Sequence, residues 1–353
     1  MRIVVVTTSF PRTEDDPSGH FVRSSAHALA RAGHEVHVIA PGGSPLDPPR
    51  TLGDLVVHRA GGGALFAWPG AVARAREAPW RLFAAGPFAA GVAHRRRSIG
   101  PVDHAVAHWI VPSAWPLLLG AQSSLDVFAH GADVRVLIRA PRALRETILG
   151  ALIARGARFT FAARALEDAL CKTLSPELAQ ALARASHVDP PPIDVPDVIG
   201  EARRLRASIG LDPSSLLVVV VCRLIPSKRV DLAIEAARIA GSSARLVIIG
   251  DGPERASLEQ RGAGAATFMG ALPRRQALAW IAASDVLLHP SAIEAAPTVI
   301  REARALDVPV IACAAGDVVS WAEADPGIIV AEASAASLAG ALQLQARRRS
   351  TRA

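Results

Sequence analysis

Two carboxylates and two cations in the C-terminal part of this 353-residue sequence could bind a phosphorylated ligand. Glu294 and Glu302 are separated by seven residues, and Arg223 and Lys228 follow an apolar run earlier in the chain. Arginine offers a planar fork and lysine a point charge, so the two cations could clamp a diphosphate. The alternatives are a structural ion pair for the cations and an ordinary helix-surface glutamate for Glu302.

The segment between the two carboxylates predicts a loop followed by a helix. A short apolar strand at 286–290 precedes Glu294, and the apolar positions from Val299 onward keep helical spacing. Proline suits the first helical position because its missing N–H would be unpaired there anyway. The free amides and the positive end of such a helix suit a phosphate or diphosphate. The residues of this turn are Ala295, Ala296, Pro297 and Thr298.

Two histidines are expected at the carboxyl ends of parallel strands. His108 ends a predicted strand at 102–108, and His130 ends another at 125–130. Open parallel sheets bind ligands at this edge. A lone histidine is more often structural than catalytic, and the repeated placement at strand ends shifts that balance somewhat toward a site. The Gly-Asp-Gly-Pro turn at 250–253 is interpreted as structural first.

The elements that must position these residues alternate between strands and helices. A strand at 2–8, a polar loop at 9–20, a helix at 21–32 and a strand at 35–40 form a βαβ unit. After a proline-rich run at 189–196, the same alternation restarts with an apolar strand and a helix. A run so rich in proline is a stiff connector.

The sequence therefore predicts an α/β protein with two Rossmann-like, doubly wound domains that face a cleft. The predicted domains are 1–190 and 191–353, and the Arg-rich tail at 347–353 is expected to pack back or to be disordered. At this length two cores are expected, because single cores stop growing at roughly 250–300 residues.

A basic segment at 67–97 alternates arginines with aromatic residues and ends in Arg95, Arg96 and Arg97. A basic amphipathic segment can lie on an anionic membrane surface. A solvent-facing helix whose apolar side packs on the sheet explains the same pattern, and we retain both interpretations. Its aromatic residues are Trp68, Trp80, Phe83 and Phe88.

Composition excludes several classes of protein. The formal charge is +7, and the aromatic residues do not alternate with basic ones along any predicted strand, so nucleic-acid binding has little support. Three widely spaced cysteines suggest a reducing compartment and neither a disulfide framework nor a metal site. We expect no signal peptide and no transmembrane helix. We expect a cytoplasmic protein, which could also associate peripherally with the inner face of the membrane.

Several motifs of other enzyme classes are missing from the sequence. No Gly-x-Gly-x-x-Gly follows the first strand, and there is no Gly-Lys-Ser/Thr phosphate loop, so nicotinamide-dependent and P-loop functions have little support. No Gly-x-Ser-x-Gly elbow and no pair of histidines at metal-binding spacing occurs. We expect no cofactor and no metal.

Taken together, the motifs resemble those of the GT4-type retaining glycosyltransferases, which have the GT-B fold. The resemblance covers nearly the whole chain and is strongest from residue 218 onward. Besides Glu294 and Glu302, the motifs on which the resemblance rests are residues 33–36, 108–109, 130–133, 191–194, 223–228, 246–253, 268–270 and 285–291.

The resemblance implies transfer of a sugar from a nucleotide diphosphate donor, with retention at the anomeric carbon and without a metal. By analogy, Arg223 and Lys228 hold the diphosphate, Glu302 binds the ribose and Glu294 binds hydroxyls of the donor sugar. His130 lies near the reacting sugar, and the loop around Gly19 closes over donor and acceptor. Donor binding belongs to the C-terminal domain and acceptor binding to the N-terminal one.

The chain departs from the family at three places. Ala295 and Ala296 stand where the family usually has a glycine and a bulky residue, and Gly19 stands alone where a pair is common. A later Gly-Gly-x-x-Glu pattern is reduced at 316–320. A Gly-like backbone at Ala295 would cost about 1 kcal/mol or more.

Two functions of different classes follow from these observations. The first is a sugar transferase that acts on an unidentified acceptor, such as a lipid-linked or cell-envelope glycan. The second is a GT-B protein that has lost turnover and binds a nucleotide sugar or a partner glycosyltransferase.

Overall fold

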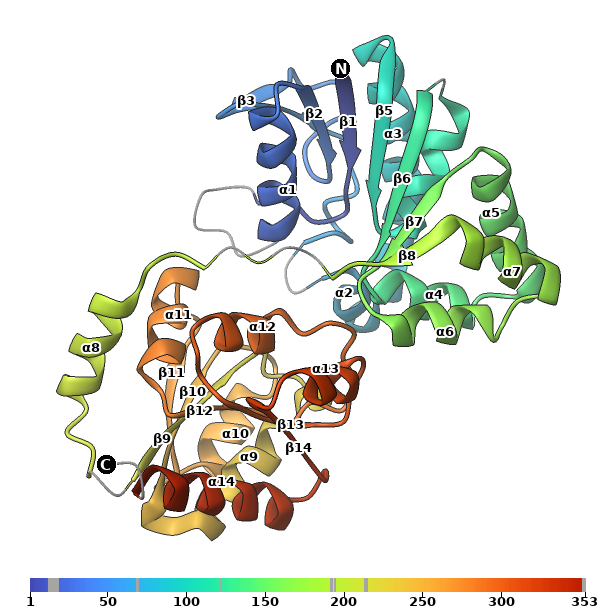
Figure 1. Cartoon of the computed structure of the whole chain (residues 1–353). Coiled ribbons are helices and arrows are strands. Elements are labelled where there is room, and N and C mark those ends of the chain that lie inside the picture. The colour runs from blue at the N-terminus through green and yellow to red at the C-terminus, as the bar shows by residue number, and fades with distance from the viewer. Residues whose placement is uncertain are drawn as a thin grey trace. The chain divides into compact units, whose positions relative to one another are not determined.

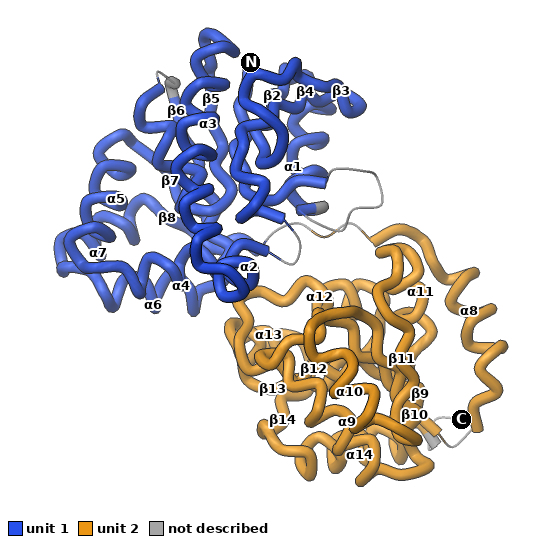
Figure 2. The backbone as a smooth tube through the Cα atoms, turned by 180° about the vertical axis from the view of Figure 1, so that it is seen from behind, with its two compact units in different colours: residues 1–192 blue, residues 193–353 orange. Residues whose placement is uncertain are grey.

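The computed structural model describes residues 1–11, 19–67, 70–120, 122–190, 193, 195–212 and 215–350. Parts of the predicted loop at 9–20 (residues 12–18), Trp68, most of 191–194 and the last three residues, 351–353, lie outside the described residues. The chain divides into two compact units, 1–192 and 193–353 (Figure 2). The division falls inside the proline-rich run.

The N-terminal unit is built on a sheet with the strand order β3-β4-β2-β1-β5-β6-β7-β8 (Figure 1). All pairs are parallel except β3 with β4. Its strands are β1 (Arg2–Val6), β2 (Glu35–Ala40), β3 (Arg50–Leu52), β4 (Leu55–Arg59), β5 (Val102–His108), β6 (Gln122–Ala129), β7 (Arg158–Phe161) and β8 (Ser186–Val188).

Helices cover the faces of this sheet. The helices are α1 (His20–Arg31), α2 (Ala71–Glu77), α3 (Ala85–Ile99), α4 (Ala132–Arg139), α5 (Arg142–Ala154), α6 (Arg164–Cys171) and α7 (Pro176–Ala185). Three short helical turns are η1 (Pro79–Ala84), η2 (Ile110–Ala114) and η3 (Trp115–Leu119). Ile3 and Val5 of β1 share a buried cluster with Val22 and Ala26 of α1. The predicted βαβ opening is confirmed.

The C-terminal unit has a parallel sheet with the strand order β11-β10-β9-β12-β13-β14 (Figure 1). Its strands are β9 (Leu216–Val221), β10 (Ala244–Ile249), β11 (Ala266–Gly270), β12 (Val286–His289), β13 (Val310–Cys313) and β14 (Ile328–Ala331). The strand order reverses between β9 and β12, and open α/β sheets bind ligands at the carboxyl ends of the strands at such a point.

Both faces of the C-terminal sheet are covered, which explains why β9 is apolar at every position. Leu216, Val218 and Val220 belong to one buried cluster, and Leu217 and Val219 belong to the cluster on the other face. Doubly covered parallel strands require such continuous apolar runs. The helices are α8 (Ile199–Ser208), α9 (Val230–Ala240), α10 (Arg255–Arg261), α11 (Arg274–Ala283), α12 (Thr298–Ala305), α13 (Val318–Ala324) and α14 (Ala335–Ser350), with turns η4 (Pro226–Lys228) and η5 (Gly241–Ser243).

The Arg-rich tail packs back onto the C-terminal unit as far as the structure describes it. Residues 347–350 form the last turn of α14. Arg349 donates to the Ser215 carbonyl at 2.8 Å and to Asp285 Oδ2 at 3.1 Å. Asp285 also accepts from Arg206 and from the Leu217 amide. This network anchors the tail at the start of β9.

The basic segment at 67–97 folds as α2, η1 and α3, and its terminal arginines do not all face solvent. Arg95 and Arg96 are buried. Arg95 donates to the carbonyls of Asp47 and Arg59, which belong to other elements of the unit. Only Arg97 of these three arginines is exposed. Arg96 donates to the Gly100 carbonyl at 2.7 Å, so the Arg95 and Arg96 side chains bind carbonyls of their own unit and not a solvent-facing surface. Contact of the rest of the segment with a membrane stays a prediction. In the part of the chain that the structure describes, none of the helices has the length and hydrophobicity of a membrane-spanning segment.

Candidate active site

The loops after β9 and β12 bring Lys228 and Glu294 together at the carboxyl ends of the C-terminal strands. The two strands are neighbours, with Leu287 opposite Val219. Lys228 Nζ donates a hydrogen bond to Glu294 Oε1. His289 Nε2 lies 2.9 Å from the same carboxylate oxygen. The sequence predicted the first two residues of this cluster and missed His289.

The electrostatics of this cluster keep Glu294 ionised. Burial by itself would raise the pKa of Glu294, but the hydrogen bonds and charges of His289 and Lys228 outweigh it and lower that pKa to about 2. The Glu294 side chain is only 11% exposed and that of Lys228 16%. The site therefore contains a carboxylate and an ammonium held together in a largely dry environment.

Arg229 connects the loop after β9 to the loop after β12 through hydrogen bonds. The sequence analysis did not predict this role. Its backbone has the left-handed conformation, with φ 47°. Its guanidinium donates to the carbonyls of Pro290, at 2.8 Å, and Ser291, at 3.0 Å. The Ala292 amide also donates to the Ser227 carbonyl at 2.8 Å. The geometry of the Lys228–Glu294 pair is thus fixed by the backbone around it.

The turn at 250–253 supports the loop that carries Arg223. Gly250 has φ 138°, and a Cβ there would lie 1.8 Å from the Cys222 carbonyl oxygen. A Cβ on Gly252 would lie 2.3 Å from the Leu224 carbonyl oxygen. The Leu224 amide donates to the Asp251 carbonyl at 2.9 Å. The turn therefore packs directly against the loop after β9, which agrees with its interpretation as a structural turn. The Arg223 side chain on that loop is exposed.

The same loop contains a thiol. Burial raises the pKa of Cys222 to about 12, with the Lys228, Glu294 and Arg223 charges nearby. The thiol therefore stays protonated at neutral pH.

The two alanines after Glu294 carry no backbone strain. Among the described residues, positive φ angles outside glycine occur at Trp109, Arg229 and Asp307, and so at neither Ala295 nor Ala296. The glycine requirement lies instead at Gly316, with φ 58°. A Cβ there would lie 2.2 Å from the Ala295 carbonyl oxygen. The cost that the sequence suggested for Ala295 does not arise in this backbone.

The helix after Glu294 begins one residue later than predicted. Helix α12 starts at Thr298, and Pro297 is its N-cap residue, with an extended ψ of 111°. Glu302 lies in α12 and is 9% exposed. Arg274, at the start of α11, donates to Glu302 Oε1 from Nε at 3.2 Å and from its terminal nitrogen at 2.7 Å. This ion pair was not expected from the sequence. It orients the Glu302 carboxylate.

The N-terminal unit places His130 beside His108, at the ends of neighbouring strands. His108 Nδ1 lies 3.0 Å from His130 Nε2. The buried Asp133 accepts from the backbone amides of His130, at 3.2 Å, Gly131, at 2.9 Å, and Ile110, at 2.8 Å. Burial raises the pKa of Asp133 in spite of these amides. Asp133 thus holds the backbone on both sides of the histidine pair.

Gly19 is buried where α1 begins, with φ 64°. A Cβ there would lie 2.2 Å from the Ser9 carbonyl oxygen, so the chain after β1 packs tightly against the start of the helix. The placement explains a glycine at this position by close approach of the backbone. Its predicted role in closing over donor and acceptor stays a prediction.

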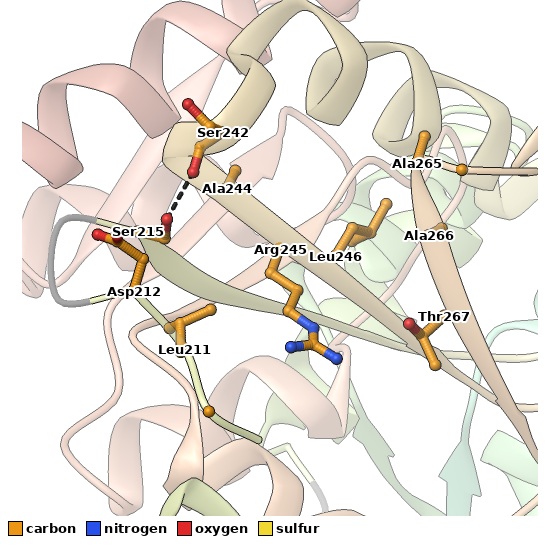
Figure 3. A pocket seen from close by; sticks show the side chains of 12 residues that line it. Leu211, Asp212, Ser215, Ser242, Ala244, Arg245, Leu246, Ala265, Ala266 and Thr267 are labelled. Carbon is orange, nitrogen blue, oxygen red and sulfur yellow. Dashed lines mark hydrogen bonds between the residues drawn. The ribbon is translucent and has the colours of Figure 1, made fainter.

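A pocket of about 460 Å³ opens at the amino ends of β9, β10 and β11 (Figure 3). Its lining includes Ser215, Ser242 and Arg245. It lies at the opposite edge of the sheet from Lys228 and Glu294 and contains no predicted site residue. Among the described residues, no three His, Cys, Asp or Glu side chains are grouped as ligands for a metal ion.

Comparison with known proteins identifies the family. Residues 201–352 match the family described as glycosyl transferases group 1. A GDP-mannose-dependent alpha-mannosyltransferase of Mycolicibacterium smegmatis is 30% identical over 328 residues, which is 90% of this chain and 80% of that protein. A Bacillus subtilis chain named as a teichuronic acid biosynthesis glycosyltransferase, TuaC, is 34% identical over 138 residues, 39% of this chain and 35% of its own length.

Solved structures show the same fold. Sucrose-phosphate synthase from Thermosynechococcus elongatus superposes with a TM-score of 0.73 at 20% identity, over 99% of this chain and 94% of that one. HepE of Anabaena, solved in complex with UDP, superposes with a TM-score of 0.66 at 18% identity, over 98% and 89%. These neighbours confirm the GT-B fold expected from the sequence. This chain therefore belongs to the glycosyl transferases group 1 family and is a glycosyltransferase.

Proposed function

We propose that this protein transfers a sugar, with retention at the anomeric carbon, from a nucleotide diphosphate donor held by its C-terminal unit. The observation that carries the proposal is the Lys228–Glu294 pair at the point where the strand order reverses. Departure of a nucleoside diphosphate builds negative charge on the leaving oxygen. Fixed cations stabilise that charge without reorganising during the reaction.

Lys228 and Glu294 each have hydrogen-bonding groups that can still bind a ligand. A lysine ammonium has three donors, and Glu294 takes one of them. Both bonds that Glu294 receives from Lys228 and His289 reach Oε1, so Oε2 is the oxygen for sugar hydroxyls. Arg223 adds a second cation from the same loop, and the backbone amides from Thr298 onward form the start of the helix that follows Glu294. In this assignment Glu302, steadied by Arg274, accepts from the ribose.

The donor and acceptor are proposed by class. GDP-mannose is the first donor to test, because the Mycolicibacterium relative is a GDP-mannose-dependent enzyme by name. UDP-sugars come next, because HepE was solved with UDP. The acceptor is proposed to be a lipid-linked or cell-envelope glycan, bound by the N-terminal unit on the cytoplasmic side of a membrane. His130 is assigned to the reacting sugar.

The test measures nucleotide release and nucleotide binding. The full chain is incubated with GDP-, UDP- and ADP-sugars, with and without lipid-linked acceptors, and the anomeric configuration of any product is determined by NMR. The chain has two lysines, Lys228 and Lys172, so Lys172→Ala is a matched control. Lys228→Ala should lose about ten- to a hundredfold in nucleoside diphosphate affinity, and Lys172→Ala none. Binding without release under every acceptor would favour a protein that has lost turnover. Unchanged binding by Lys228→Ala would refute the clamp.

We also propose that the N-terminal unit contacts an anionic membrane through a surface that we call the Trp80 patch. It consists of exposed apolar side chains on α2 and η1: Val72 (42% exposed), Trp80 (63%), Leu82 (57%) and Phe83 (83%). The Arg81 guanidinium lies 5.8 Å from the centre of the Trp80 ring. Aromatic and aliphatic side chains next to arginines suit the interface between headgroups and acyl chains.

Vesicle co-sedimentation tests this surface. Trp80→Ser with Phe83→Ser should weaken binding to vesicles that contain phosphatidylglycerol at least severalfold, because the burial of two aromatic side chains is lost. Leu46→Ser is the control, since Leu46 is 79% exposed outside the patch. Equal binding of all three proteins would leave the Trp80 patch as ordinary surface.

A further inference from the structure

The histidine pair in the N-terminal unit has a geometry that defines where its protons lie. His108 is the last residue of β5, and its register partner on β6 is Phe128, two residues before His130. The ring planes of His108 and His130 are almost parallel, with an angle of 12° between them, and one hydrogen bond of 3.0 Å joins Nδ1 of His108 to Nε2 of His130. One proton must therefore lie between these two nitrogens.

Aromatic neighbours enclose the pair and keep both rings neutral. The His108 ring stacks on Phe128 at 4.9 Å, and the His130 ring lies 4.9 Å from Phe21 and 4.8 Å from Trp109. Burial lowers the pKa of His108 to about 3 and that of His130 well below its ordinary value, with His108 contributing to the second shift. At neutral pH each ring then carries a single proton.

Two arrangements of these protons are possible. In the first, His108 donates from Nδ1, so its Nε2 is a bare lone pair, and the proton of His130 resides on Nδ1. In the second, His130 donates from Nε2, so His108 must carry its proton on Nε2. Among the described residues, His108 Nε2 is buried and has no hydrogen-bond partner. The second arrangement would bury an N–H donor without an acceptor.

The first arrangement is favoured because an unpaired donor is the rarer and costlier defect in a protein interior. Buried N–H groups without partners are rarer than acceptors with unused lone pairs. Among the described residues, the His130 ring makes its one side-chain hydrogen bond to His108. With His130 accepting at Nε2, its Nδ1–H remains as the donor that the ring can offer to a ligand.

We propose that His108 is a positioning residue that sets the tautomer of His130, so that His130 presents Nδ1–H as a neutral hydrogen-bond donor to an oxygen of the sugar substrate. The proposal rests on the assignment of His130 to the reacting sugar made above. An imidazole of fixed tautomer can recognise a hydroxyl or ring oxygen without adding a charge. Such control through the other ring nitrogen is a general way to orient functional histidines.

Three variants of the full chain separate this role from simple packing. In His108→Asn, the side-chain amide nitrogen can take the place of Nδ1 and still donate to His130. His108→Phe keeps a flat ring against Phe128 but cannot donate. Ser113→Ala, which alters another buried polar side chain without a hydrogen-bond partner among the described residues, controls for general effects on this unit. Thermal unfolding verifies that each variant is folded.

The primary readout is the ¹⁵N NMR spectrum of the His130 ring without substrate. In the unaltered protein and in His108→Asn we expect a protonated Nδ1 and a bare Nε2, whereas His108→Phe should populate the form with Nε2 protonated. In a transfer assay His108→Phe should lower kcat/KM on the order of ten- to a hundredfold, with His108→Asn recovering most of the loss. A protonated Nε2 in the unaltered protein would overturn the proposal. Equal loss in the Asn and Phe variants, or no loss in either, would also overturn it.

The two parts of the test fail independently. If the unaltered protein transfers no sugar from any donor, the proposed function fails, while the NMR spectrum still reports whether His108 sets the tautomer. If transfer occurs but the tautomer of His130 is the same in the Phe variant, the proposed function stands and the positioning role of His108 is refuted.

Discussion

Lys228 hydrogen-bonds Glu294 across 66 residues of sequence, and this bond joins the loop after β9 to the loop after β12. His289 contacts the same carboxylate oxygen, so one acidic side chain holds two basic groups at the reversal of the strand order. The pair is largely buried, with side chains 16% and 11% exposed. Loss of either member should therefore affect both the stability of the C-terminal unit and the binding of a ligand to the other member.

Removing the ammonium alone should destabilise the C-terminal unit. Lys228→Met leaves the Glu294 carboxylate buried with His289 as its remaining partner, and such a loss costs about 3 kcal/mol. Adding Glu294→Gln should restore a substantial part of that loss, because no uncompensated charge then remains. Urea unfolding of the single and double variants measures the coupling. Strict additivity of the two single effects would contradict the interdependence of the pair.

Glu294 should not produce the acid limb of the pH–rate profile. Its pKa is lowered to about 2, so the carboxylate is ionised throughout the pH range of an ordinary assay. Glu294→Gln should lower kcat/KM by about a hundredfold, because a charged acceptor for the sugar hydroxyls is lost. It should leave the pH of half-maximal activity on the acid side unchanged. A shift of that midpoint by one pH unit would show that Glu294 titrates there.

Stability should fall on mild acidification because of buried neutral histidines. Burial, with nearby His37 and Arg95, lowers the pKa of His58 to about 4, whereas the unfolded chain keeps a value near 6.5. As the pH falls below 6.5 the unfolded state binds the proton first, so the free energy of unfolding decreases until about pH 4. At pH 5 this loss is about 2 kcal/mol relative to pH 7.

Urea unfolding at pH 7 and pH 5 measures this loss. His58→Gln should show a smaller drop between the two pH values than the unaltered chain. His94→Gln serves as control because His94 is exposed. An identical pH dependence in His58→Gln and the unaltered protein would contradict the assignment to His58.

Gly316 should tolerate no side chain, unlike a glycine in open space. Gly316→Ala places a Cβ 2.2 Å from the Ala295 carbonyl oxygen at φ 58°, so the loop after Glu294 must move. We expect a loss of more than about 2 kcal/mol in stability and at least tenfold in kcat/KM. Gly264→Ala is the matched control, since Gly264 has φ 74° but, among the described residues other than its chain neighbours, no heavy atom lies within 4 Å of where a Cβ would be. It should cost about 1 kcal/mol and no activity. Similar activity losses in both variants would show that the loop contact is unimportant.

The sequence by itself determined the alternation of strands and helices and the residues at the strand ends. The apolar run of β9 could be recognised because both faces of a doubly covered parallel strand must be apolar. Lys228 and Glu294 could be named because their residue types and their positions after apolar strands are local features. Pro297 likewise marked the start of α12 to within one residue.

Only the tertiary structure decided which of these residues meet and which side chains face inward. Arg95 and Arg96 looked like surface charges, yet Arg95 satisfies carbonyls 36 and 48 residues away. His289, Arg229 and Arg274 gained their roles from neighbouring strands or helices, which no local pattern reveals. The physical reason is that parallel strands pair across long connections. A charge that is solvated in one arrangement of those connections is buried against a carbonyl or carboxylate in another.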